Sequence, residues 1–224
     1  MIIAIDGPAA SGKSTTARLV ALRLGFAYID TGAMYRALVW FLQQQQLDPA
    51  SSTDLEHIQT TFRYRMIPEA AGERHFVNDT DVTEVIRTPE ITNRLNQITP
   101  LPQIRDFLVQ LQRELASQGD VVLDGRDIGT VVCPQAELKI FLVASLEVRA
   151  ARRAAEQRAN GWEVDLVEIR NSISARDQAD SSRRVGPLQR ATDAVELDTS
   201  SLTINEQVDE IVSMASRLNG RSTT

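Results

Sequence analysis

The sequence is poor in cysteine and histidine, the residues that most often bind transition metals or form disulfides. Its 224 residues include one cysteine, Cys133, and two histidines. A single cysteine excludes a disulfide within the chain and a cysteine metal cluster, and two histidines disfavour a histidine metal site. This usage is typical of a reducing compartment, so we expect a cytoplasmic protein.

The chain also lacks long apolar runs and an excess of positive charge. No stretch of about 18 apolar residues is present, and the start, MIIAIDG, has neither the basic region nor the long apolar region of a signal peptide. Lysine and arginine number 24 against 30 acidic residues, which gives a net charge of −6. This balance disfavours a nucleic-acid polymer or an anionic membrane as the main partner. We expect a monomer that acts on small molecules.

Hydrophobic residues make up 42% of the chain, enough to fill the core of one sizeable domain. Short apolar stretches alternate with segments of helical spacing, a rhythm that predicts an α/β fold with a parallel sheet. A pair of alternating segments, 62–67 and 74–77, predicts a small antiparallel insert. Strands are expected at about 2–5, 26–29, 120–124, 138–143 and 194–197, and helices at about 15–24, 33–46, 90–98, 102–117, 165–176 and 204–218, with one more after Ser145.

One segment near the start carries a specific chemical signal. Residues 7–14 read GPAASGKS, the G-x-x-x-x-G-K-S pattern of a phosphate-binding P-loop, and they lie between an apolar strand and a helix. Gly7 and Gly12 allow positive φ and bring backbone amides close to phosphate oxygens. Lys13 reaches the outer phosphates as a point charge, and the Ser14 hydroxyl can join the coordination of Mg²⁺. The segment therefore predicts a site for the phosphate chain of a nucleoside triphosphate.

Charged residues near two strand ends bear on what those phosphates are used for. Arg36 lies about one helical turn after Asp30, and it either binds the phosphate of an acceptor molecule or pairs with a nearby acid; the residues leave both readings open. Asp124-Gly125-Arg126-Asp127 follows a buried strand. That position favours a magnesium-side acid and an arginine at the carboxyl edge of the sheet over simple turn chemistry.

Two arginine-rich segments follow later in the chain. The first precedes the helix break at 160–162 and is suited to closing over transferring phosphates, although a solvated helix face is the more usual role of a charge run. It contains Arg149, Arg152, Arg153 and Arg158. The second contains Arg176, Asp180 and Arg183, which either bind the sugar, phosphate or base of a ligand or form a network of surface ion pairs.

Seven segments, in order over nearly the whole chain, resemble the bacterial cytidylate kinase family. They read GPAASGKST, YIDTGAMYRA, VTEVIRTPEI, DGRDIGTVV, KIFLVAS, RDQADSSRRVGPL and AVELDTSSLTI. The resemblance implies an adenylate-kinase-like fold: a five-stranded parallel sheet with helices on both faces, a small antiparallel insert in the acceptor-binding region, and a short lid. It also implies one P-loop kinase domain, with a core at about 1–30, 118–150 and 166–224, an acceptor-binding region at about 31–117 and a lid at about 151–165.

The resemblance further implies direct in-line transfer of the γ-phosphoryl group of ATP to CMP or dCMP, with Mg²⁺ and without a phosphoenzyme. By motif, the ATP-binding residues would be Gly7, Pro8, Ala9, Ala10, Ser11, Gly12, Lys13, Ser14 and Thr15, with Ser14 as the Mg²⁺ ligand. The substrate-binding residues would be Thr31, Arg36, Asn96, Arg105, Arg126, Asp127, Arg176, Asp180 and Arg183. The catalytic residues would be Lys13, Arg126, Asp127 and Arg153. At Asn96 the family commonly has serine, and an asparagine side chain also both donates and accepts hydrogen bonds.

Two other functions compete with this hypothesis. A P-loop kinase for another small acceptor, such as UMP or a nonphosphorylated metabolite, would share the phosphate loop. A GTP-binding switch is disfavoured, because the sequence has neither an N-K-x-D base motif nor a D-x-x-G segment. A panel of acceptors in an ADP-release assay separates the two kinases.

Overall fold

The computed structural model describes residues 1–69, 72–159 and 161–220, and the chain divides into two compact units. Unit 1 consists of Met1–Tyr28 and Ala116–Thr224, and unit 2 of Ile29–Leu115. A five-stranded sheet has the order β2-β6-β1-β7-β8, and β1 pairs in parallel with both β6 and β7, as β7 does with β8. The strands are β1 (Ile2–Asp6), β2 (Ala27–Asp30), β6 (Val121–Gly125), β7 (Leu138–Val143) and β8 (Val195–Asp198). The predicted α/β class with a five-stranded parallel sheet is confirmed.

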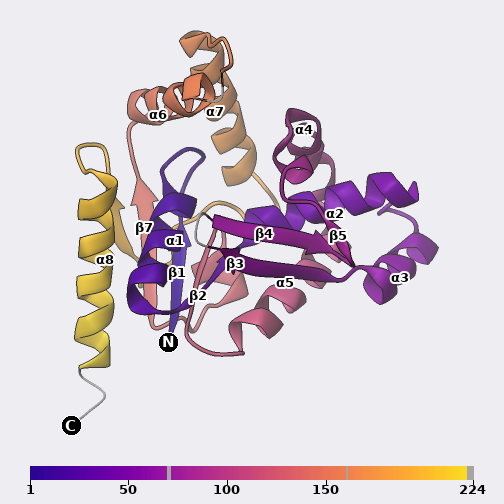
Figure 1. Ribbon diagram of the computed structural model, residues 1–224, viewed down its shortest axis with the longest axis horizontal. Coiled ribbons are helices and arrows are strands. Elements are labelled where there is room, and N and C mark those ends of the chain that lie inside the picture. The colour runs from indigo at the N-terminus through magenta and orange to yellow at the C-terminus, as the bar shows by residue number, and fades with distance from the viewer. Residues whose placement is uncertain (70–71, 160, 221–224) are drawn as a thin grey trace. The chain divides into compact units, whose positions relative to one another are not determined.

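The core of unit 1 lies between the central strands and two helices. Apolar side chains of β1 and β7, among them Ile3, Ile5 and Leu142, are fully buried against α1 (Lys13–Leu24) and α8 (Ile204–Asn219). The two helices pack side by side (Figure 1). Each buried aliphatic side chain contributes about 1.5–3 kcal/mol to the free energy of folding, relative to an exposed one. This apolar layer therefore stabilises the strands that flank the phosphate loop.

Three further elements complete unit 1. A π-helical turn, η2 (Ile128–Val132), follows β6 directly. Helices α6 (Leu146–Ala159) and α7 (Leu166–Ser181) pack against each other as a helical hairpin (Figure 1). Asp165 caps α7, since its side chain accepts from the backbone amides of Val167 and Glu168.

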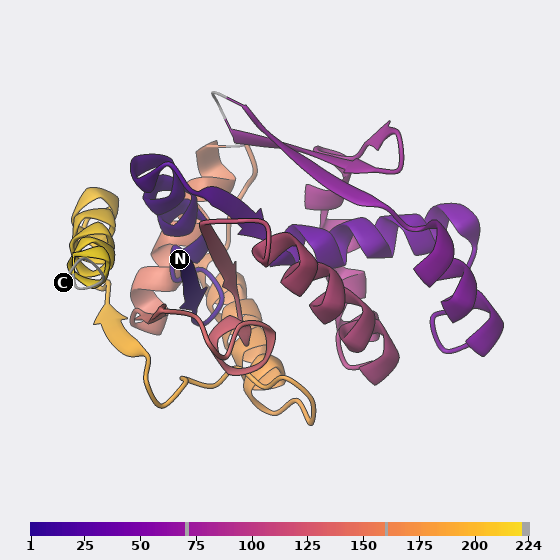
Figure 2. The ribbon, with the colours of Figure 1, turned by 90° about the horizontal axis from the view of Figure 1, so that it is seen from below.

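Unit 2 is built on the long helix α2 (Thr31–Gln45). The Asp30 carboxylate caps α2 by accepting from the Ala33 amide at 2.7 Å. The antiparallel sheet has the order β3-β4-β5, its two long strands are the purple ribbons of Figure 2, and the predicted antiparallel insert is therefore confirmed. The remaining elements of this unit are α3 (Ser52–Thr61), β3 (Tyr64–Glu69), β4 (Gly72–Val77), β5 (Thr80–Asp81), η1 (Val85–Arg87), α4 (Pro89–Ile98) and α5 (Pro102–Ala116).

The structure contains a helix that the sequence did not predict and extends another beyond its predicted end. Helix α3 was not predicted, because its apolar positions are few and Ile58 alone is buried. Helix α7 extends to Ser181, although the apolar pattern that predicted it ends near Ile173. Its last turns are held by polar contacts of Asp177 and Asp180 instead of apolar packing. Among the described residues, no helix is long and apolar enough to span a membrane.

Candidate active site

The loop between β1 and α1 has the backbone of a phosphate cradle. Gly7 has φ 150° and Gly12 has φ 92°, which confirms the predicted positive φ at both glycines. Ala10, between them, is also left-handed with φ 58°, and such alternation turns successive amides toward one concavity. A Cβ on Gly7 would lie 2.2 Å from the carbonyl oxygen of Leu142 in β7. Glycine is therefore required at position 7 by space as well as by φ.

Lys13 is the first residue of α1 and is buried at the base of this loop. Its Nζ donates to the Pro8 carbonyl oxygen at 2.7 Å, which folds the side chain back along the loop. Burial lowers the pKa of Lys13 well below its ordinary value, and the nearby positive charges of Arg126 and Arg176 lower it further. Asp124 and Asp6 oppose this effect without cancelling it. Burial is the largest of these causes, and an anionic ligand at the loop would favour the charged form of Lys13.

Ser14, the next residue, joins the loop to the end of β6. Its hydroxyl donates to one carboxylate oxygen of Asp124 at 2.8 Å, and the Tyr28 hydroxyl donates to the other at 2.7 Å. Asp124 is buried, whereas Ser14 is exposed. The described residues contain no cluster of three or more acidic, histidine or cysteine ligands. A serine with one carboxylate fits Mg²⁺, which keeps several waters and takes further oxygens from substrate phosphates.

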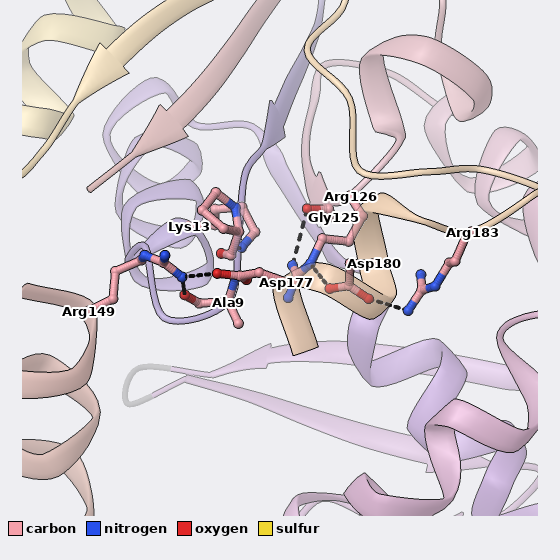
Figure 3. Close-up of polar contacts among 9 residues, drawn as sticks. Ala9, Lys13, Gly125, Arg126, Arg149, Asp177, Asp180 and Arg183 are labelled. Atoms are coloured by element: carbon pink, nitrogen blue, oxygen red, sulfur yellow. Dashed lines mark hydrogen bonds and ion pairs between the residues drawn. The ribbon is translucent and has the colours of Figure 1, made fainter. Parts of the chain in front are cut away.

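Asp180 in α7 joins two of the predicted acceptor-side arginines (Figure 3). Its Oδ2 accepts from Arg126 Nε at 2.7 Å, and its Oδ1 accepts from Arg183. Burial alone would raise the pKa of Asp180, but the two arginines outweigh it and the pKa is lowered. The pairing holds both guanidinium groups in place while part of each remains exposed.

Asp6, the last residue of β1, fixes the turn that carries Arg126 and Asp127. Its carboxylate accepts from the backbone amides of Ile128 and Gly129, each at 2.8 Å. Burial raises the pKa of Asp6 to about 6, although the two amides and Lys13 favour the ionised form. Sequence reasoning missed Asp6. The available sequence signal was an acid at the carboxyl end of an apolar strand. The structure adds that Asp6 lies in register with Gly125.

The arginines of α6 lie in different surroundings in the structure. Arg149 is buried and donates to the Ala9 carbonyl oxygen of the phosphate loop. Arg152 donates to the Ser11 carbonyl oxygen of the loop at 3.3 Å and to the Thr199 hydroxyl at 3.0 Å. Arg153, the predicted catalytic arginine, has a side chain 42% exposed and pairs with Glu156 at 2.9 Å. A catalytic role for Arg153 stays a prediction.

Four of the predicted substrate residues lie in unit 2. Thr31 begins α2 and is buried, Arg105 in α5 is also buried, and Asn96 in α4 is exposed. Arg36 Nη2 lies 3.1 Å from Asp30 Oδ2, while its Nε is buried without a hydrogen-bond partner among the described residues. Burial would raise the pKa of Asp30, but Arg36 and the Ala33 amide lower it. Arg36 thus pairs with an acid and keeps one donor available.

In unit 1, Asp127 is buried directly after Arg126, and Arg176 is exposed on α7 near Lys13. The structure therefore brings Arg126, Asp180 and Arg183 together on the same side of Lys13 (Figure 3), and Arg176 is close enough to act electrostatically on both Lys13 and Asp180. Positive charge with a buried lysine, a concave row of amides and a serine–carboxylate pair is suited to transfer of a phosphoryl group, which needs positioning and charge neutralisation.

The family model described as cytidylate kinase matches residues 3–217. A cytidylate kinase of Geobacillus sp. (strain WCH70) is 49% identical over 210 residues, 94% of each chain. A cytidylate kinase of Carboxydothermus hydrogenoformans is 43% identical over 98% of this chain and 99% of the relative. A solved structure of an uncharacterized protein from Eubacterium ventriosum aligns with a TM-score of 0.53 at 11% identity, covering 97% of this chain and 98% of that one, and is similar in fold alone. This chain belongs to the cytidylate kinase family and is a nucleoside monophosphate kinase.

Proposed function

We propose that this kinase transfers the γ-phosphoryl group of ATP to CMP or dCMP and forms CDP or dCDP. The observation that carries the choice of a triphosphate donor is the loop with positive φ at Gly7 and Gly12 and with Lys13 buried at its base. The loop amides and Lys13 would bind the phosphate chain of ATP. We assign this role to Gly7, Pro8, Ala9, Ala10, Ser11, Gly12, Lys13, Ser14 and Thr15.

Mg²⁺ is the metal we propose for the reaction. The Ser14 hydroxyl, oriented by Asp124, would hold it together with oxygens of the phosphates. When bound, Mg²⁺ neutralises charge on the phosphate oxygens. Lys13 and Arg126 supply positive charge from the protein side, and the buried Asp124 holds the serine hydroxyl by accepting its hydrogen bond.

For acceptor binding we propose the residues that match the family motifs, and we assign them unit by unit. In unit 1 we assign Arg126, Asp127, Arg176, Asp180 and Arg183 to this role, and in unit 2 Thr31, Arg36, Asn96 and Arg105. Arginine forks suit the acceptor phosphate, and a carboxylate suits sugar hydroxyls or the base. Arg36 supports the assignment because its Nε remains available within a buried environment.

No nucleophilic side chain is needed for this chemistry. A phosphate oxygen of the acceptor forms the new bond to the γ-phosphorus as the bond to the leaving diphosphate breaks. The protein contributes position and charge, and we propose that Arg153 and the segment at about 151–165, of which residue 160 lies outside the described residues, close over the phosphates and keep water out. In the domain organisation we propose, the core takes in about 1–30, 118–150 and 166–224, and the acceptor region about 31–117.

A substrate panel tests the proposal. An ADP-release assay with ATP and Mg²⁺ would compare CMP, dCMP, UMP, AMP and shikimate as acceptors. We expect kcat/KM to be highest for CMP or dCMP. A higher value for UMP or for a nonphosphorylated acceptor would overturn the CMP assignment, and activity without divalent metal would overturn the role of Mg²⁺.

We also propose that the protein works as a cytoplasmic monomer. The single cysteine and the small nucleotide substrates of the family support a reducing compartment. Sedimentation equilibrium at working concentration tests the monomer, since a mass twice that of the chain would contradict it. Cell fractionation tests the compartment.

A further inference from the structure

One residue of the phosphate loop, Ala9, is held by the α6–α7 hairpin. Its methyl group is buried in an apolar cluster with Ala150 and Ala154 of α6 and Ile169 and Ile173 of α7. This cluster is separate from the apolar core between β1, α1 and α8. The tip of the phosphate loop therefore packs against two helices that follow it by more than a hundred residues in sequence.

A charged pair binds both backbone polar groups of the same residue (Figure 3). The Ala9 amide donates to Asp177 Oδ1 at 3.0 Å, and the Ala9 carbonyl oxygen accepts from Arg149 Nη1 at 3.1 Å. Arg149 also pairs with the other carboxylate oxygen of Asp177, and its Nε donates to the Ala144 carbonyl oxygen at 3.0 Å. Arg149 comes from α6 and Asp177 from α7, so the pair closes a polar bracket around Ala9.

This bracket acts on the strained part of the loop. The next residue, Ala10, is a non-glycine residue with φ 58°, a conformation that persists only where surrounding contacts hold it. Burying an arginine and a carboxylate is also costly unless their hydrogen bonds are satisfied, and here four contacts satisfy them. Arg149 has a side chain 9% exposed, on a helix whose other arginines include the half-exposed Arg153.

We infer that Arg149 and Asp177 are positioning residues for the phosphate loop: by fixing Ala9 they preorganise the loop amides for the donor phosphates. The inference rests on the phosphate loop being the ATP site, as proposed above. It joins the α6–α7 hairpin to the donor site, so that a displacement of the hairpin changes affinity for ATP. Preorganisation of this kind lowers the cost of ordering the loop on binding.

The test compares the bracket with a matched pair between the same helices. Arg149→Lys keeps the charge but loses the fork, Asp177→Ala removes the acceptor of the Ala9 amide, and Asp177→Asn keeps one acceptor. The control pair is Arg170–Glu147, also between α7 and α6, at 3.6 Å and with side chains 53% and 70% exposed. Arg170→Ala and Glu147→Gln remove it without touching the loop.

We expect Arg149→Lys and Asp177→Ala to raise the Kd for ATP, measured by calorimetry without acceptor, between about 10- and 100-fold. The KM for ATP should rise in parallel, while the KM for CMP at saturating ATP stays within about threefold. Asp177→Asn should recover part of the loss, and the double variant Arg149→Lys/Asp177→Asn should be no weaker than the weaker single variant, because both act through Ala9. The control variants should bind ATP as the parent does.

Thermal melting separates positioning from stability. A variant that melts at a lower temperature but binds ATP normally when assayed well below that temperature would overturn the inference. If Arg149→Lys does not fold, Asp177→Ala carries the test alone because it removes the acceptor of the Ala9 amide, and unchanged ATP binding by that variant would likewise overturn the inference. Failure of the parent protein itself to bind ATP would instead contradict the proposed donor.

Discussion

Arg126 Nε lies 2.7 Å from Asp180 Oδ2, so the turn after β6 is tied to the last turns of α7. The same carboxylate pairs with Arg183. One acid thus orients two arginines that are 57 positions apart in the numbering and that no local pattern would connect. Removal of its charge is expected to release both.

For Asp180→Asn we therefore expect a rise in the KM for CMP of about 10- to 100-fold, with the KM for ATP changed less than about threefold. Loss of the buried charge partner is also expected to cost about 1–3 kcal/mol of unfolding free energy. Steady-state kinetics with each substrate varied and urea unfolding measure the two effects. Asp193→Asn is the control: Asp193 pairs with Lys139 at 2.8 Å and is exposed. Equal effects on both KM values would contradict the acceptor-side role.

Lys13→Met should abolish most activity without unfolding the protein. A lysine that places positive charge on transferring phosphates is worth about 10²- to 10³-fold in kcat. Because burial and Arg126 lower the pKa of Lys13, its charge is unfavourable in the protein without ligand, and methionine should keep or raise the melting temperature. Kinetics and thermal melting followed by circular dichroism provide the check. A marked fall in melting temperature would show that Lys13 has a structural role instead.

Gly7→Ala should be far more disruptive than Gly25→Ala. Both glycines have positive φ, but only the Cβ at position 7 would meet backbone, 2.2 Å from the Leu142 carbonyl oxygen. At Gly25, which caps α1 with φ 71°, nothing lies within 4 Å. For Gly25→Ala we expect the free energy of unfolding to fall by about 1 kcal/mol, from the conformational cost alone. For Gly7→Ala we expect a fall of about 3–5 kcal/mol, because the steric overlap adds to that cost. Similar losses in urea unfolding for the two variants would contradict the steric argument.

Asp6→Asn should change how stability depends on pH. Burial raises the folded-state pKa of Asp6 from 3.8 to about 6, so between these values the folded protein binds a proton that the unfolded chain has released. The contribution of Asp6 to the free energy of unfolding is therefore fully present below about pH 4. It declines between about pH 4 and pH 6, and the total decline is about 3 kcal/mol. Lys13 and Asp127 are the charged groups that act on it.

The measurement is the difference in unfolding free energy between Asp6→Asn and the parent protein, from urea titrations between pH 4.5 and pH 7.5. As pH rises, the variant should gain unfolding free energy relative to the parent protein. A constant loss is also expected, because asparagine offers only one acceptor to the Ile128 and Gly129 amides. A difference that does not vary with pH would contradict the raised pKa. His75, whose pKa is lowered by burial to about 4, affects both proteins equally and cancels in the difference.

Local patterns predicted the elements that depend on local physics. Apolar runs predicted the parallel strands because the central strands β1, β6 and β7 are buried by their neighbours and by the helices, although the edge strand β8 is largely exposed. The glycine spacing of the phosphate loop predicted positive φ at Gly7 and Gly12, because glycine has no Cβ and the preference is a property of the single residue. The end of α7 was misjudged because its last turns are held by the Asp180 pairs with Arg126 and Arg183, one of which reaches across 54 positions.

The arginines of α6 show where sequence reasoning stopped. Helical spacing places Arg149, Arg152 and Arg153 within about one turn, but it does not say which of them points toward the phosphate loop. Packing of α6 against α7 decides this, and it buries Arg149 against Ala9 while Arg153 remains half exposed. The contact between Ala9 and Asp177 spans 168 positions and has no sequence signature.

By itself, the sequence determined that a phosphate loop follows the first strand, that the fold is α/β with a parallel sheet, and that arginines and acids cluster near strand ends. These properties follow from residue spacing and backbone conformational preference. The tertiary structure alone decided that Asp6 holds the Arg126 turn, that Asp180 orients two arginines, and that Arg149 and Asp177 bracket Ala9. Each of these depends on which distant side chains burial brings within hydrogen-bond distance.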